Sequence, residues 1–236
     1  MFEFHLHIKN YQSYEFMMNL LPWFVSGFVD GEGTFAINIR KGSRYRLGWS
    51  VEPAFSIGLH PKDEEILIHI REYFGGGGIG TIHKNTRMVS CPASLQGRVH
   101  SLEQISNIII HFDRYPLITN KHADYLLFKE VIQMLLKKEH LTQEGLQAIV
   151  NIRGALNKGQ TPLLKEAFPN SVAVPRPLVK LASTLPDPNW LAGFTAGEGC
   201  FLVNLRKSSS HKFGMRVMLR FKLTQHTRDE QLLKSI

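Results

Sequence analysis

The apolar positions in the first third of the chain change period several times. They predict a helix, a strand, a turn, a second strand and a second helix over residues 22–30, 34–40, 41–48, 49–59 and 61–74. The first helix is a continuous apolar segment that begins at Pro22, which suits a first helical turn. Gly31 and Gly33 are expected to end it with a left-handed C-cap. In the next strand, Phe35 and Ile37 alternate with small or polar residues, so one face should be buried.

Residues 75–168 extend this unit. Residues 75–91 predict a hairpin that turns at Lys84–Asn85, and residues 101–115 predict a helix with a capping box between Ser101 and Gln104. Three more helices are expected over 119–139, 142–157 and 161–168, of which the first is a core helix rather than a membrane anchor. The predicted order is therefore αββαββα plus further helices.

The chain then repeats its beginning. Residues 22–67 align with residues 188–233 without a gap, and 18 of the 46 aligned positions are identical. A repeat of this length predicts two similar α+β domains. We expect the first repeat over residues 1–168 with an N-terminal extension, a proline-rich linker over 169–187 and a partial second repeat over 188–236.

The second repeat is expected to be truncated, because the sequence stops inside its second predicted helix. Large side chains on one face of its strands would then lack the helices that cover the first repeat, namely Phe201, Val203, Leu205, Phe221 and Leu223. Each forgoes about 1.5–3 kcal/mol of burial. We therefore expect the second repeat to be poorly ordered, sticky or dependent on a partner.

Charge and cysteine content narrow the classes of function. The net charge of +8 favours a polyanionic partner, nucleic acid first and an acidic membrane surface second. Cys91 and Cys200 stand far apart, which argues against a disulfide framework and a cysteine zinc site. The sequence lacks an apolar run of the roughly 20 residues that cross a bilayer. Its N-terminus does not read as a signal or transit peptide, so a protein acting in an organelle would be made there.

Two nine-residue segments carry a family resemblance. VSGFVDGEG (25–33) and LAGFTAGEG (191–199) resemble the motif of the LAGLIDADG homing endonucleases, and HFDRYPLITNKHADYLLFKEV, KKEHLT and ALNKG resemble their single-chain, two-repeat members from fungal mitochondrial introns. The resemblance implies a pseudo-twofold tandem αββαββα fold with two saddle-shaped antiparallel sheets on a long asymmetric DNA site. It also implies a mitochondrial location and, if the second repeat folds, a monomer.

The resemblance assigns the acids of the motif. Glu32 and Glu198 stand at its metal-binding position. Asp30 matches the first acid, which in this family mainly caps or braces the helix end, whereas its repeat partner is Ala196. That difference does not by itself imply inactivity.

Elementary physical chemistry leads to the same site. The two repeats each contain G-x-x-x-G with a small residue beside it, a spacing that lets helix backbones approach closely. The expected interface residues are Ser26, Gly27, Asp30, Ala192, Gly193 and Ala196. Such contact brings Glu32 and Glu198 together at two negative helix ends, where a divalent cation relieves their repulsion. Hard oxygen ligands favour Mg²⁺ or Mn²⁺, with Gly31 and Gly197 as further contributors to the metal site, and such ions promote phosphodiester hydrolysis.

The polar faces of the strands are candidates for reading double-stranded DNA. A β-ribbon fits the major groove, where Arg reads guanine and Asn reads adenine. The candidates in the first repeat are Thr34, Asn38, Arg40, Arg44, Arg46, Ser50, Glu52, Ser56, Lys84 and Arg87. Those in the second repeat are Asn204, Arg206, Lys207, Lys212, Arg216, Arg220 and Lys222.

Several of these residues also have a purely structural explanation. A single Gly-Glu-Gly turn is usually only a turn, and Asn38 and Asn204 can be solvated strand residues. His60 and His226 are better explained as caps of the helices that follow than as chemical groups. GGGGIG (75–80) follows a helix and precedes a strand, the reverse of a dinucleotide-binding motif.

The sequence is therefore compatible with three functions. The first is a site-specific DNA endonuclease with metal bound by two motif glutamates. The second is a truncated, inactive remnant of one. The third is a maturase that binds intron RNA and assists splicing. None of the three involves a membrane.

Overall fold

Each copy of the repeat begins with a short helix that leads directly into a strand. In the computed structural model, which describes residues 20–75, 83–85, 94–179 and 184–236, α1 (Pro22–Glu32) is followed by β1 (Gly33–Lys41), β2 (Trp49–Leu59), the 3-10 turn η1 (Pro61–Asp63) and α2 (Glu64–Tyr73). The second copy has the same order in α7 (Pro188–Glu198), β5 (Gly199–Lys207), β6 (Met215–Leu223), η3 (Thr227–Asp229) and α8 (Glu230–Lys234). The predicted helix–strand–strand–helix order is confirmed in both copies.

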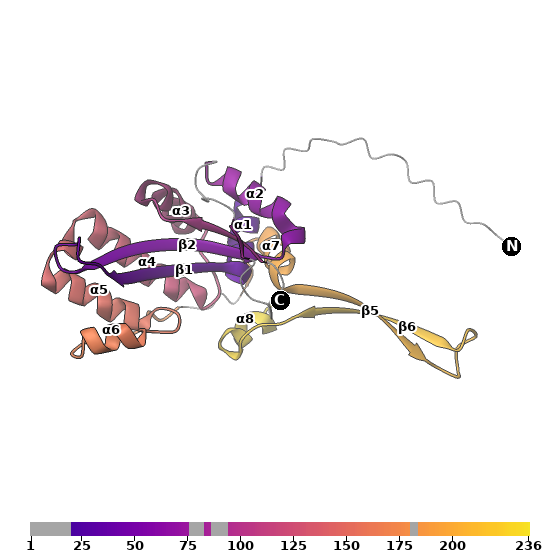
Figure 1. Cartoon of the computed structure of the whole chain (residues 1–236). Coiled ribbons are helices and arrows are strands. Elements are labelled where there is room, and N and C mark those ends of the chain that lie inside the picture. The colour runs from indigo at the N-terminus through magenta and orange to yellow at the C-terminus, as the bar shows by residue number, and fades with distance from the viewer. Residues whose placement is uncertain (1–19, 76–82, 86–93, 180–183) are drawn as a thin grey trace.

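The first repeat adds a second hairpin and a helical layer. Strands β3 (His83–Asn85) and β4 (Ser94–Val99) complete an antiparallel sheet of order β1-β2-β4-β3. The helices that follow are α3 (Leu102–Arg114), α4 (Lys121–Leu136), η2 (Glu139–Leu141), α5 (Gln143–Ala155) and α6 (Pro162–Ala167). Figure 1 shows these helices gathered around β1 and β2.

The core of the first repeat forms between the sheet and those helices. Phe35 and Phe55 face each other across β1 and β2, with 1% and 0% of their surfaces exposed. Phe35 also packs edge-on against Phe112 of α3 and Tyr125 of α4. The alternation predicted for this strand therefore identifies its buried face. Among the described residues, no helix is both long and apolar enough to cross a membrane.

In the second copy, β5 and β6 form a separate two-stranded sheet. Figure 1 shows this ribbon projecting away from the body of the protein. Phe201 and Phe221 pair across it at the positions equivalent to Phe35 and Phe55, yet they are 78% and 52% exposed. The expected exposed face is thus present, although Leu223 differs because it is partly buried against the Trp190 cluster.

Three local expectations were wrong. The cap of α1, Gly33, has an extended backbone with φ −75°, and glycine is required there because a Cβ would lie 2.5 Å from Val29 Cγ1. Lys84 and Asn85 lie within β3, paired with β4, so the hairpin does not turn at these residues. Ser101 is the N-cap of α3, but its side chain makes no capping hydrogen bond.

Candidate active site at the junction of the two repeats

Helices α1 and α7 meet backbone to backbone. A Cβ added at Gly27 would overlap the carbonyl of Trp190, and one added at Gly193 would overlap the carbonyl of Phe24. Only hydrogen fits at these two positions, so the glycines allow the helices to touch. This relation is twofold symmetric, because Gly27 and Gly193 are equivalent residues of the repeat.

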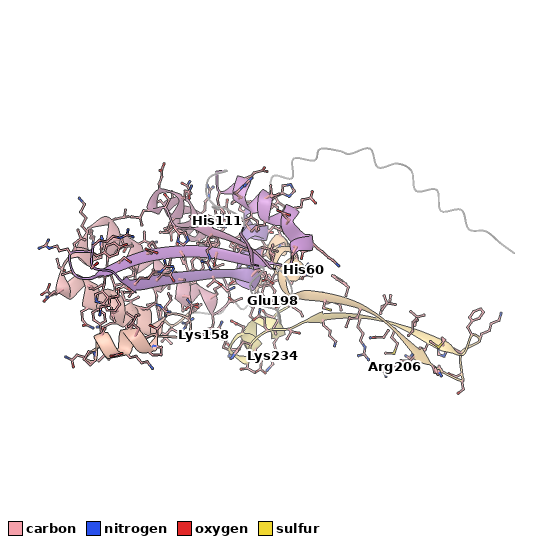
Figure 2. All side chains as sticks on the ribbon, viewed as in Figure 1. His60, His111, Lys158, Glu198, Arg206 and Lys234 are labelled. Atoms are coloured by element: carbon pink, nitrogen blue, oxygen red, sulfur yellow. The ribbon has the colours of Figure 1, made fainter. Side chains whose placement is uncertain are left out.

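The glutamates cross over at the ends of these helices. A Cβ on Gly31 would lie 3.2 Å from Glu198 Cγ, and a Cβ on Gly197 would lie 3.1 Å from Glu32 Cγ. Each glutamate side chain therefore packs over the glycine of the opposite helix. Burial, and next the charge of Glu198, raise the pKa of Glu32. Figure 2 shows Glu198 where α7 passes into β5.

Lys121 is a third charged group at this site, and it is not among the residues predicted from the sequence. It is the first residue of α4, and its Nζ donates hydrogen bonds to the carbonyls of Val29 and Gly31, both at 2.9 Å. Burial lowers the pKa of Lys121, against the opposing pull of Asp30, Glu32 and Glu198. The residue lies inside a segment that resembles the family, but its spacing from the motif indicates no role.

Asp30 sits beneath the glutamates and joins three segments. It is 2% exposed and accepts hydrogen bonds from the backbone N–H of Ile118 (2.9 Å), the hydroxyl of Thr119 (2.5 Å) and the indole N–H of Trp190 (2.8 Å). Burial raises the pKa of Asp30. Its repeat equivalent, Ala196, is exposed, so this arrangement belongs to one side of the junction only.

The predicted interface residues differ in whether they contact the opposite helix. Gly27, Gly193 and Asp30 contact the opposite helix, whereas Ala192 is exposed. Ser26 points into the first repeat, where its hydroxyl donates to the carbonyl of Tyr115 (2.7 Å) and lies 3.1 Å from His111 Nε2.

The surroundings of the two glutamates differ. Gln225 Nε2 donates to Glu198 Oε1 at 3.2 Å, but the equivalent position in the first repeat is Leu59. On that side a cavity of about 770 Å³ opens beside Glu32, lined also by Leu59, His60 and Asp63. The junction is therefore symmetric in its backbone and asymmetric in its side chains.

The two repeated histidines act as caps. His60 Nδ1 accepts from the backbone N–H of Lys62, and His226 Nδ1 accepts from that of Arg228, both at 3.2 Å. The expected capping role is confirmed.

Within the described ranges, no group of three or more His, Cys, Asp or Glu side chains is arranged to hold a metal ion. The acidic pair itself suits one, since Glu32 and Glu198 are partly buried carboxylates, burial and next the charge of Glu198 raise the pKa of Glu32, and the carbonyls of Gly31 and Gly197 directly precede the two glutamates in the chain. Carboxylate and carbonyl oxygens are the donors that Mg²⁺ accepts, with water completing its shell. One of those carbonyls, that of Gly31, also accepts from Lys121.

Most of the candidate DNA-reading residues of the first repeat lie on one face of β1 and β2 or in the turn that joins them. Thr34, Asn38 and Arg40 pair directly with Ser56, Glu52 and Ser50. Arg40 also forms an ion pair with Glu52 at 3.4 Å, while both serines are only 8% exposed. Arg44 and Arg46 lie in the turn. Lys84 belongs to β3, and Arg87 lies outside the described residues.

The second repeat places its basic residues along the ribbon. Asn204, Arg206, Arg216, Arg220 and Lys222 occupy even positions that alternate with the apolar face, and Arg206 pairs with Arg216. Lys212 lies in the turn. Lys207 has the parity of the apolar residues, so alternation places it on the other face. In Figure 2, Arg206 lies well along the ribbon, far from Glu198.

Comparison with known proteins agrees with this geometry. The family model for LAGLIDADG endonucleases matches residues 25–132 and 191–236. Two similar proteins of Neurospora crassa, probable intron-encoded endonucleases 3 and 2, are 36% and 38% identical over 97% and 92% of this chain. These alignments cover 42% and 47% of the relatives, so the chain spans less than half of their length.

Solved structures match this chain over a larger share of their own length than these relatives do. The I-SmaMI LAGLIDADG homing endonuclease bound to cleaved DNA is 44% identical with a TM-score of 0.85, over 92% of this chain and 70% of that one. The LAGLIDADG meganuclease I-CpaMI bound to uncleaved DNA is 40% identical with a TM-score of 0.81, over 91% and 70%.

Proposed function

The chain belongs to the LAGLIDADG endonuclease family, and from this premise we propose that it is a site-specific double-strand DNA endonuclease that hydrolyses phosphodiester bonds. The observation that carries the proposal is the crossing of Glu32 and Glu198 over the glycines of the opposite helices. Two strands require two reactive centres close together, and a pair of equivalent carboxylates on a twofold axis supplies one for each strand.

Glu32 and Glu198 would hold the divalent cation, Mg²⁺ or Mn²⁺, with the carbonyls of Gly31 and Gly197 as neighbouring oxygen donors. When bound, such an ion activates water and stabilises the leaving oxygen. The raised pKa of Glu32 supports this assignment, because burial and, second, the charge of Glu198 disfavour its ionised form, and a bound cation would offset both.

The chain's own side chains contribute positioning and charge. The Lys121 ammonium group places a positive charge between the acidic pair and the end of α1, where it can offset negative charge that builds up on a phosphate at the junction. Gln225 fixes the orientation of Glu198 through the bond to Oε1. Because Leu59 replaces it on the other side, Glu32 and Glu198 serve their strands from unequal surroundings.

DNA would lie along the polar faces of the two sheets. Arg40, Arg44 and Arg46 in the first repeat, and Arg206, Arg216 and Arg220 in the second, provide positive charge on either side of the glutamates. Guanidinium groups contact phosphates and guanine edges in a major groove. The solved relatives named above are bound to DNA, which supports a DNA partner for this surface.

The genetic setting follows from the relatives' names. Several are intron-encoded in fungi, and one similar protein of Saccharomyces cerevisiae is named as mitochondrial. We infer that this chain too is encoded in an organellar intron and acts where it is made, as a monomer.

The direct test is cleavage of a duplex that carries the uninterrupted insertion site of the host intron. The full chain is expected to cut both strands with Mg²⁺ or Mn²⁺, and to leave the duplex intact with EDTA or as Glu32→Gln. Sequence-specific binding without a break would identify an inactive remnant. Restored splicing of the intron by a cleavage-dead variant would favour the RNA-binding role instead.

A further inference from the structure

Hydrogen bonds within the first repeat fix part of the segment 115–120, which joins α3 to α4. Asp30 of α1 accepts from the backbone N–H of Ile118 and from the hydroxyl of Thr119. The same hydroxyl oxygen accepts from the backbone N–H of Lys121 at 3.1 Å. These bonds fix the middle of the segment against the first motif helix.

The second repeat holds the end of this segment. Asp229 Oδ1 accepts from the backbone N–H of Asn120 at 2.7 Å and from its Nδ2 at 3.0 Å, and the carbonyl of Arg228 accepts a further bond from Nδ2 at 2.7 Å. Asn120 is the N-cap of α4, and its own side chain makes no capping bond within the helix. A carboxylate from the other repeat therefore lies at the N-terminus of α4, where the helix dipole favours negative charge.

The Asp229 side chain is buried at this contact. It is 2% exposed, although it belongs to a short 3-10 turn near the surface, and its immediate neighbour Arg228 is exposed. A buried carboxylate is retained only where donors or cations satisfy it; here Asn120 donates to Oδ1, and Arg228 Nε lies 3.6 Å from Oδ2. The contact spans 109 residues of sequence.

The residue after Asn120 is Lys121, whose Nζ reaches the carbonyls at the end of α1. The direction of this side chain depends on the first turn of α4, and Asp229 anchors that turn. Asp63, the repeat equivalent of Asp229, instead lines the cavity beside Glu32. The repeated aspartate therefore has a different surrounding in each repeat.

We propose that Asp229 is a positioning residue: by capping α4 from the second repeat, it sets Lys121 against the end of α1 beside the two glutamates. Lys121 then takes its place only when the end of the second repeat is docked on segment 115–120. The catalytic consequence rests on the proposed nuclease function, whereas the placement of Lys121 does not.

The placement is tested by the reactivity of the Lys121 amine in the full chain, without DNA. Limited acetylation with acetic anhydride, quantified by mass spectrometry, is expected to proceed about fivefold faster at Lys121 in Asp229→Ala, the size of effect that loss of a helix cap has on local opening. Lys129 of α4, which pairs with Asp113 of α3, serves as the internal reference. Glu230→Ala is the matched control, because it removes only the exposed pair with Lys234 on α8.

Two more variants keep the test decisive. Asp229→Asn retains an acceptor oxygen and is expected to protect Lys121 as the unmodified chain does. If Asp229→Ala does not fold, Asn120→Ala removes the two side-chain bonds and keeps the backbone one, and it should give a smaller increase. Unchanged Lys121 reactivity in the folded alanine variant would overturn the proposal.

The catalytic consequence is tested by a double-mutant cycle. Asp229→Ala is expected to slow single-turnover cleavage about tenfold with DNA affinity nearly unchanged, and to have no further effect in a Lys121→Met background. Additive effects of the two changes would show that Asp229 acts by another route and would refute this consequence. If the unmodified chain cuts nothing, the nuclease proposal fails, while amine reactivity still decides the placement.

Discussion

Trp190 of α7 donates its indole N–H to Asp30 of α1 across the junction of the two repeats, at 2.8 Å, with both side chains buried. The same carboxylate receives the backbone N–H of Ile118 and the hydroxyl of Thr119. One aspartate thus connects both motif helices to the segment that leads to Lys121.

Removing this carboxylate should cost more than removing any one of its donors. We expect Asp30→Ala to lower the free energy of unfolding by about 3 kcal/mol or more, because several buried donors lose their acceptor together. Trp190→Phe keeps the ring and removes one donor, for about 1–2 kcal/mol. Urea denaturation measures both. A loss in Asp30→Ala no larger than in Trp190→Phe would contradict the connecting role.

The glycine contact makes the junction intolerant of a single methyl group. Gly27→Ala and Gly193→Ala would drive Cβ into backbone carbonyls of the opposite helix, and backbone cannot give way as a flexible side chain does. We expect each to lower the unfolding free energy by about 3 kcal/mol or more. Gly58→Ala is the control, since a Cβ there meets nothing within 4 Å. Equal thermal stability of all three variants would refute the close contact.

Whether the sequence predicts a structural feature depends on how far apart in the chain the residues that determine the feature lie. Helices and strands of the repeats were predictable because their period and capping residues are local, as the cap of His60 illustrates. The meeting of Glu32 and Glu198 was a prediction that the repeat allowed, because symmetry supplies the pairing. Lys121 and Asp229 were not predicted, because their contacts join residues 90 to 109 positions apart in the sequence. One partner in each contact, Lys121 or Asn120, also lies outside the two aligned segments of the repeat.

Glu32→Gln should separate activity from stability. Burial and, second, the charge of Glu198 raise the pKa of Glu32, so a neutral amide at this position removes both the desolvation cost and the repulsion, and the melting temperature without divalent metal should rise at neutral pH. Cleavage should fall by about a hundredfold or more, because an amide is a poor metal ligand and carries no charge. Differential scanning fluorimetry and single-turnover cleavage measure the two effects. A less stable variant would argue against repulsion between the acids.

His111 gives the first repeat a pH-dependent stability. It is 6% exposed, between Ser26 and Tyr73, and burial lowers its pKa to about 4. Because the unfolded chain takes up this proton near pH 6.5, the unfolding free energy should fall as the pH drops from about 6.5 to about 4, by up to about 1.4 kcal/mol per pH unit. Denaturation at a series of pH values measures the slope. In His111→Gln this part of the slope should vanish, and its persistence would assign it to other groups.

The two sheets offer the same aromatic residue in opposite environments, which permits a matched comparison. Phe35 is 1% exposed in the core, and its repeat equivalent Phe201 is 78% exposed on the ribbon. Phe35→Thr should lower the unfolding free energy by about 3 kcal/mol or more, through lost burial and an unsatisfied hydroxyl. Phe201→Thr should leave it nearly unchanged and reduce binding of the apolar dye ANS, since less apolar surface is open to solvent. Urea denaturation and ANS fluorescence measure the pair. A stability loss at Phe201 as large as that at Phe35 would mean that its ring is buried in solution.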